Sequence, residues 1–399
     1  MKESLAAAPL VHGVPIVFLM FGAVLIGILS FHRRSLEIAA AGLAVILATR
    51  LGFSDLRLGA HLAHEWVKLA NLFGLLVGFT LLADHFEKSG LAALLPRVLP
   101  RGARGCFALL LVVWLLSGVL DNIAAAMIGA TTAAAIFRGR VHLGYLAAIV
   151  AAANAGGAGS VIGDTTTTMI WLEGVSPLAV LPAYTGAFAS LLVFGTFASR
   201  QQNRHAPLGA DEGVAVHVDG RRLGLVVVAL VVMVATNVIA NKLVQGSEEP
   251  LPFLALALWT VLLGGARLRP PTWTLLPAAL RSGLFLLALV FSASLMPVEA
   301  LPPPSWRTTF GLGAVSALFD NIPLTKLALE QGGYDWALLA YAVGFGGSML
   351  WFGSSAGVTV ANAFPEARSA PRWLRQAWHV PLAYVVGFAA QRAVHGWAP

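Results

Sequence analysis

Charged residues are scarce in this chain. Only 11% of its 399 residues are Asp, Glu, Lys or Arg, and 58% are hydrophobic. A soluble domain carries roughly a quarter charged residues. Together with a mean hydropathy of +0.78, this composition predicts an all-α polytopic membrane protein rather than a soluble domain.

Cysteine and the motifs of common enzymes are also missing. The single cysteine, Cys106, excludes an internal disulfide. The sequence has no P-loop for ATP, no His or Cys cluster with metal-ligand spacing and no G-x-S-x-G nucleophile. We therefore expect neither an enzyme nor a resident cofactor. The net charge of +7 indicates cytoplasmic loops rather than nucleic-acid binding, because Arg and Lys concentrate in those loops.

Long apolar runs predict the transmembrane helices. A helix that spans the bilayer needs about 20 apolar residues. The first run is followed directly by Arg33 and Arg34 and shows no small-residue cleavage site, so we interpret it as a span and not as a signal peptide. The simple spans predicted are 14–31, 36–53, 64–85, 183–199, 223–241, 252–266, 282–299 and 377–396.

Four further segments are apolar but interrupted. Residues 105–137 and 308–330 each carry an Asp-Asn pair near the middle, and we predict that both are re-entrant hairpins. Residues 142–171 and 336–363 contain "NAGGAGSVIGDTTTT" and "GFGGSMLWFGSSAG", which predict broken helices because glycine disfavours helix interiors. The total is about ten spans plus two hairpins, two of the spans being broken helices.

Basic residues predict the topology. With both termini outside and the hairpins entering from opposite sides, most of the 26 Lys and Arg residues fall on the cytoplasmic side. We expect the bacterial cytoplasmic (inner) membrane. The chain then divides into a first inverted repeat (1–199), a cytoplasmic linker (200–222) and a second inverted repeat (223–399).

Matching residues support the repeat. Asp121 and Asp320 are 199 residues apart, whereas Gly156, Gly157 and Gly163 precede Gly346, Gly347 and Gly353 by a constant 190 residues. Inverted repeats with discontinuous helices are typical of secondary transporters.

Three carboxylates lie at predicted membrane depth: Asp121, Asp164 and Asp320. A carboxylate there costs roughly 2.5–3.5 kcal/mol, so such residues usually mark an ion pathway, although each could also accept bonds from nearby backbone amides. Amide and hydroxyl oxygens accompany them, and hard cations prefer shells made entirely of oxygen. Burial also favours a protonated carboxyl group, so proton and cation can compete for one site.

The motifs "SGVLDN", "ANAGGAGSVIGDTTTTMIW", "SALFDNIPL" and "GGSMLWFGSSAGV" resemble those of NhaD-type sodium/proton antiporters of the ion transporter superfamily. The resemblance implies an inverted-repeat fold with hairpins, an elevator-like mechanism and a homodimer embedded in membrane lipid. It implies ion-site roles for Asp121, Asn122, Asn154, Asp164, Thr165, Thr166, Asp320, Asn321, Ser354 and Ser355. Among these, Asp121, Asn122, Asp164, Asp320 and Asn321 are the expected ligands of a transported sodium ion.

The sequence departs from the family pattern in two places. Ala124, Ala125 and Ala126 stand where threonines are usual, which removes possible oxygen ligands. Lys326 stands where a small apolar residue is usual. Its ammonium is either a snorkelling group near a hairpin base or a buried charge partner that occupies a cation position.

The function predicted is therefore secondary active exchange of sodium or lithium for protons. An anion permease for a carboxylate, arsenite or a similar oxyanion is the alternative, favoured by Lys326 and by helix N-termini at the hairpin tips.

Overall fold

Helices make up most of the structure. The computed structural model describes residues 10–11, 14–31, 34–53, 56–91, 99–207, 218–243 and 251–399. In these ranges the only strands are β1 (Leu10–Val11) and β2 (Val14–Pro15), which pair antiparallel. The predicted all-α class is confirmed.

Every predicted simple span corresponds to a helix. Four helical stretches, Ser35–Phe53, Leu58–Lys88, Pro177–His205 and Trp273–Ser294, are long and apolar enough to cross a membrane individually. Large apolar side chains such as Val231 (61% exposed) and Leu263 (55% exposed) lie on helix surfaces, as expected for an integral membrane protein that contacts lipid. The helices are α1 (Ile16–Ser30), α2 (Ser35–Phe53), α3 (Leu58–Lys88), α9 (Ala183–His205), α10 (Gly220–Leu243), α11 (Phe253–Gly265), α12 (Leu276–Ser294) and α18 (His379–His395).

The four interrupted segments each form two short helices. None of these helices exceeds 15 residues, about 22 Å at 1.5 Å per residue, which is less than the roughly 30 Å of bilayer hydrocarbon. Whether the first and third pairs re-enter the membrane stays a prediction. The pairs are α5 (Ala103–Ser117) with α6 (Asn122–Ile136), α7 (Leu143–Gly157) with α8 (Thr165–Leu172), α13 (Trp306–Ser316) with α14 (Asn321–Gln331), and α15 (Trp336–Gly346) with α16 (Ser355–Ala363).

The chain folds into two compact units. Unit 1 comprises residues 1–81, 227–303 and 322–332, and unit 2 comprises residues 82–226, 304–321 and 333–399. In unit 1, α2 packs against α1 and α12. Two side chains join α3 to α11: Asn71 Oδ1 accepts from Ala255 N (3.1 Å), and Trp259 Nε1 donates to the Gly74 carbonyl (2.9 Å).

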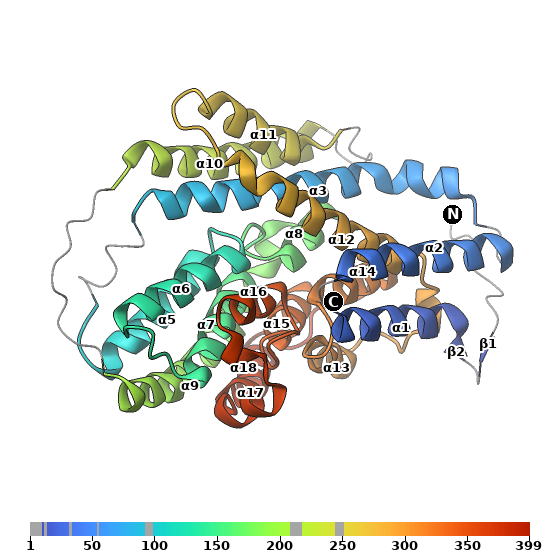
Figure 1. The fold of residues 1–399 in the computed structure, drawn as a ribbon. Coiled ribbons are helices and arrows are strands. Elements are labelled where there is room, and N and C mark those ends of the chain that lie inside the picture. The colour runs from blue at the N-terminus through green and yellow to red at the C-terminus, as the bar shows by residue number, and fades with distance from the viewer. Residues whose placement is uncertain are drawn as a thin grey trace. The chain divides into compact units, whose positions relative to one another are not determined.

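Helix α7 is the centre of unit 2. All of its residues are buried, as expected for a helix that is apolar on every face. It packs against α5, α6, α9, α15 and α16. Helices α9 and α18 lie side by side within this unit (Figure 1), and their close approach depends on Gly186 and Gly387, each of which faces the other's carbonyl. Small residues allow this approach in membrane helix packing.

The predicted linker is partly helical. Helix α9 extends to His205 and α10 begins at Gly220, while residues 208–217 lie outside the described residues. Both units draw on both predicted repeats. The division into compact units does not test whether residues 1–199 and 223–399 share one fold. The repeat boundaries therefore stay a prediction. The other elements of the described residues are α17 (Ala370–Gln376) and 3-10 turns at Pro177–Val180, Trp273–Leu275, Val298–Ala300 and Pro365–Arg368.

Candidate functional site

Asp164 lies where the two Asp-Asn motifs meet. It occupies the N-cap position of α8 and is 1% exposed. Asn122 Nδ2 donates to Asp164 Oδ1 at 2.9 Å. Asn321 Nδ2 donates to Thr166 Oγ1 at 2.9 Å and, more weakly, to Asp164 Oδ1 at 3.4 Å. One buried carboxylate is therefore held by neutral amides from both halves of the sequence.

Asn154 extends this network to the second glycine-rich segment. Its Oδ1 accepts from Asn122 Nδ2 (3.1 Å), and its Nδ2 donates to Ser348 Oγ (2.9 Å) and Ser354 Oγ (3.0 Å). Asn154, Ser348 and Ser354 are all buried. Six of the residues predicted for the site thus form one hydrogen-bonded cluster: Asn122, Asn154, Asp164, Thr166, Asn321 and Ser354.

The other predicted residues lie at the ends of the short helices and are partly exposed. Asp121 caps α6, where its Oδ2 accepts from Ile123 N (3.2 Å). Asp320 Oδ2 accepts from Ser355 Oγ (2.8 Å). Thr165 is the first residue of α8 and makes no side-chain hydrogen bond within the described part of the chain.

Glycines let backbone approach backbone at the helix breaks. A Cβ on Gly156 would collide with the Trp114 carbonyl, and one on Gly346 would collide with the Gly313 carbonyl. Gly344 serves the site directly, because a Cβ there would lie 3.0 Å from Asp164 Oδ2. The glycine clusters therefore position carbonyl groups and leave room for the carboxylate.

The ionisable side chains of the predicted site are carboxylates. Asp121 and Asp320 are the charged groups whose fields act on Asp164. In the described ranges, no Lys or Arg pairs with Asp121 or Asp164. In the same ranges, no three His, Cys, Asp or Glu side chains converge to hold a metal by themselves. A bound cation would therefore also need the amide, hydroxyl or carbonyl oxygens of this site.

Ala124, Ala125 and Ala126, which replace the usual threonines, give this part of α6 no side-chain oxygen. Ala125 and Ala126 are fully buried, so methyl groups fill the space that hydroxyl groups would occupy. The neutral side-chain oxygens of the candidate site come from the amides, the serines and Thr166.

Lys326 belongs to a separate charge cluster in unit 1. Its Nζ lies 2.9 Å from Glu65 Oε2 and 2.7 Å from Glu330 Oε1. Its side chain is 3% exposed and that of Glu65 is 4% exposed. A snorkelling lysine keeps its ammonium at the surface, and this ammonium is buried. Lys68 and His64 lie further from Glu65, at 3.8 and 3.9 Å.

Sequence reasoning missed Ser348, Glu65 and Glu330. Ser348 follows the glycine pair of its segment and carries no distinguishing pattern. Glu65 did leave a signal, since it is a carboxylate inside an apolar helix with Lys68 one turn away on the same face. That pattern indicates a buried or compensated charge.

Comparison with proteins of known function identifies three similar sequences. "Sodium/proton antiporter 1" of Arabidopsis thaliana is 28% identical over 318 residues, which cover 71% of this chain and 54% of that protein. The chain is similar to sodium/proton antiporters. "Na(+)/H(+) antiporter NhaD" of Alkalimonas amylolytica is 27% identical over 334 residues, or 71% of this chain and 67% of that protein. "Sodium/proton antiporter 2" of Arabidopsis thaliana is 27% identical over 287 residues, or 61% of this chain and 66% of that protein.

These similarities confirm the resemblance that the motifs predicted. The chain spans little more than half the length of the first relative and about two thirds of the other two. No protein-family model matches the chain.

Proposed function

We propose that this protein is a secondary active transporter that exchanges sodium or lithium for protons. One observation carries the proposal: among the described residues, the buried Asp164 carboxylate has only neutral partners, Asn122, Asn321 and Thr166, and it lies in the field of two further aspartates. An uncompensated buried carboxylate is costly. The site therefore favours occupation by either a cation or a proton.

Competition for Asp164 accounts for exchange. When Asp164 is protonated, the carboxyl group is neutral and has little attraction for a metal ion. When the proton leaves, the carboxylate can join the Asn154, Ser348 and Ser354 oxygens in binding a monovalent cation. Asn122 and Asn321 each carry both an amide donor and a carbonyl oxygen, so rotation of either side chain can replace a donor with a ligand.

An anion permease is the second candidate. Helices α6, α8, α14 and α16 all begin at the site, and the positive ends of helix dipoles attract anions. However, the N-cap positions of α6 and α8 are already occupied by Asp121 and Asp164. A carboxylate at the positive end of each of these helices would repel a second anion, so we favour the cation.

We also propose the inverted repeat. Ser117 Oγ donates to the Ala153 carbonyl (2.5 Å), and Ser316 Oγ donates to the Val343 carbonyl (2.8 Å). The two serines are 199 residues apart and the two carbonyls 190, the separations found in the sequence. The glycine contacts repeat as well, since a Cβ on Gly157 or Gly347 would meet the Gly163 or Gly353 carbonyl at 2.6 Å in both cases. These paired contacts support a common architecture for the two halves.

An elevator-like mechanism fits the division into units. All ten predicted site residues belong to unit 2, so a movement of that unit would carry the complete site. Homodimerisation, the bacterial inner membrane and the outside location of both termini are further parts of the proposal.

Proton flux in sealed vesicles tests the function. The purified protein is reconstituted with a pH-sensitive dye inside, and sodium, lithium, potassium, citrate or arsenite is added outside. We expect proton movement with sodium or lithium only. Asp164→Asn should abolish this flux, because it removes the titrating group and keeps the shape of the side chain.

Asp335→Asn is the matched control. Asp335 is also a buried N-cap aspartate of unit 2, but its oxygens accept backbone N–H groups of Leu338 and Ala398 outside the site. This variant should retain flux. Proton movement driven by citrate or arsenite would favour the anion permease, and full sodium-driven flux in Asp164→Asn would overturn the proposed site.

A further inference from the structure

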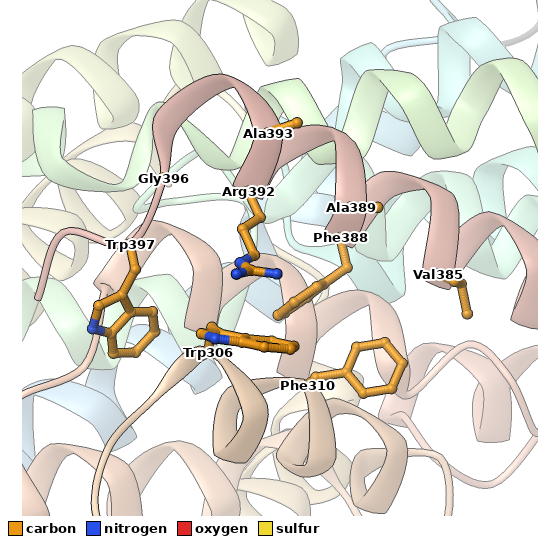
Figure 2. Close-up of a pocket in the computed structure, with 9 residues that line it drawn as sticks. All are labelled: Trp306, Phe310, Val385, Phe388, Ala389, Arg392, Ala393, Gly396 and Trp397. Atoms are coloured by element: carbon orange, nitrogen blue, oxygen red, sulfur yellow. The ribbon is translucent and has the colours of Figure 1, made fainter.

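We propose that a cavity between α13 and α18 binds one anionic phospholipid, with the phosphate at Arg392 and an acyl chain along the neighbouring apolar wall. The cavity has a volume of about 540 Å³ and lies entirely within unit 2. Figure 2 shows Arg392 reaching from α18 toward the ring of Trp306, with Phe388 and Phe310 on one side and Trp397 on the other. This inference does not depend on the transport function.

Arg392 supplies the charge for the headgroup. Its Cζ lies 3.8 Å from the centroid of the Trp306 ring. This cation–π contact orients the guanidinium without using its N–H groups as hydrogen-bond donors. Within the described residues, Arg392 has no carboxylate partner and its side chain donates no hydrogen bond. A planar guanidinium with free N–H groups matches phosphate oxygens in a bidentate arrangement.

The rest of the cavity suits an acyl chain. Phe310, Phe388, Val385 and Ala389 provide an apolar wall without a second charged group. The surface of α18 beside it is also apolar, with Val385 49% and Val394 67% exposed. In a membrane this helix face contacts lipid. A ligand with an anionic head and an apolar tail fits both halves of the cavity, whereas a free anion would fit only one.

The cavity also lies where a headgroup would be found. Helix α13 begins at Trp306, and α18 ends at His395. Trp306 and Trp397 line the cavity at these helix ends, and tryptophan is enriched where membrane meets water. Arg392 in the last turn of α18 also compensates the negative end of that helix dipole, and this purely structural role must be separated by experiment.

Native mass spectrometry of the full chain provides the test. Purified protein in neutral detergent is titrated with phosphatidylglycerol, phosphatidylcholine or inorganic phosphate. We expect one phosphatidylglycerol per chain to bind roughly tenfold or more tightly than phosphatidylcholine, the range expected for one charge-assisted contact. Arg392→Gln should remove this preference.

Arg307→Gln is the matched charge control. Arg307 also faces the Trp306 ring, at 5.3 Å, but does not line the cavity, so the lipid preference should persist. A second pair of variants tests the tail: Ala389→Trp fills the cavity and should prevent binding with Arg392 intact, whereas Val394→Trp places the same bulk outside it. Circular dichroism melting verifies that each variant is folded.

Three results would overturn the proposal. Equal affinity for both lipids in the wild type would remove the role of the anionic headgroup. An equal loss in Arg307→Gln and Arg392→Gln would indicate diffuse surface charge. Displacement of the lipid by inorganic phosphate, or unchanged binding in Ala389→Trp, would indicate an anion contact without an acyl-chain site.

Discussion

Removal of the Lys326 ammonium should destabilise unit 1. In Lys326→Met, the side chain keeps most of its length, but Glu65 loses the partner at 2.9 Å while its side chain remains only 4% exposed. Breaking a buried ion pair in this way costs about 3–5 kcal/mol. Lys68 stays 3.8 Å from Glu65 and is 30% exposed, so we expect a value near the lower end, about 3 kcal/mol.

The double variant Lys326→Met/Glu65→Gln isolates the pair. Both charges are then absent, and replacement of a buried pair by neutral groups is often close to neutral in stability. We expect the double variant to recover most of the loss, with a coupling energy of about 2–3 kcal/mol. Glu330→Gln should cost less than about 1 kcal/mol, because its side chain is 31% exposed.

Denaturant unfolding of the wild type, Lys326→Met, Glu65→Gln and the double variant under one condition gives the coupling energy, and Glu330→Gln is measured beside them. Wild-type stability in Lys326→Met would refute the reasoning, and so would a double variant no more stable than the single. Transport adds a second readout. If Lys326 only compensates Glu65 and Glu330, the double variant should keep sodium-driven proton flux with a wild-type pH profile. A shifted pH profile of flux would indicate that the Lys326 ammonium takes part in transport in place of a bound cation.

Three further predictions concern the site and its support. Asn154→Leu should cost about 1–3 kcal/mol for each buried group left without a partner and abolish flux, because Asn122, Ser348 and Ser354 all bond to Asn154; flux and unfolding measurements check this. Gly156→Ala should prevent folding, whereas Gly311→Ala, which has open space around it, should give a normal yield of folded protein. Ser355→Ala removes the hydroxyl hydrogen bond to Asp320 and should weaken the apparent sodium affinity roughly tenfold. Ser190→Ala is the control, because that hydroxyl bonds within its own helix. Unchanged sodium affinity in Ser355→Ala would show that Asp320 does not belong to the ion site.

The helices were predictable because local composition determines them. Apolar runs of about 20 residues form helices in the predicted places, and the glycine-rich stretches break α7 from α8 and α15 from α16. The ends were less predictable. Helix α3 begins at Leu58 instead of 64, and α12 ends at Ser294 instead of 299. Polar residues such as His61 are tolerated in the first turn of α3, whereas α12 stops shortly before Pro297, which cannot donate a backbone hydrogen bond. Hydropathy locates neither end.

Side-chain partners depend on packing between distant segments. The Asp-Asn motifs identified Asn122 and Asn321, but nothing local shows that both donate to Asp164. The Asn154–Ser348 bond joins residues 194 positions apart, and the Lys326–Glu65 pair joins residues 261 apart. Such contacts follow from the tertiary fold, which a single sequence does not specify position by position.

The two glycine-rich segments differ at the positions that matter most for charge. With the constant separation of 190 residues, Asn154 corresponds to Gly344 and Asp164 to Ser354. A strictly symmetric site would place a second carboxylate at 354, near the amides that hold the first. Instead Ser354 accepts a hydrogen bond from Asn154, and Gly344 leaves space beside Asp164 Oδ2. The buried centre therefore carries one carboxylate, which in the proposed mechanism would be neutralised by one monovalent cation or one proton, while Asp121 and Asp320 lie at the partly exposed helix ends. This asymmetry gives the proposed competition between ion and proton a single buried position at which to occur.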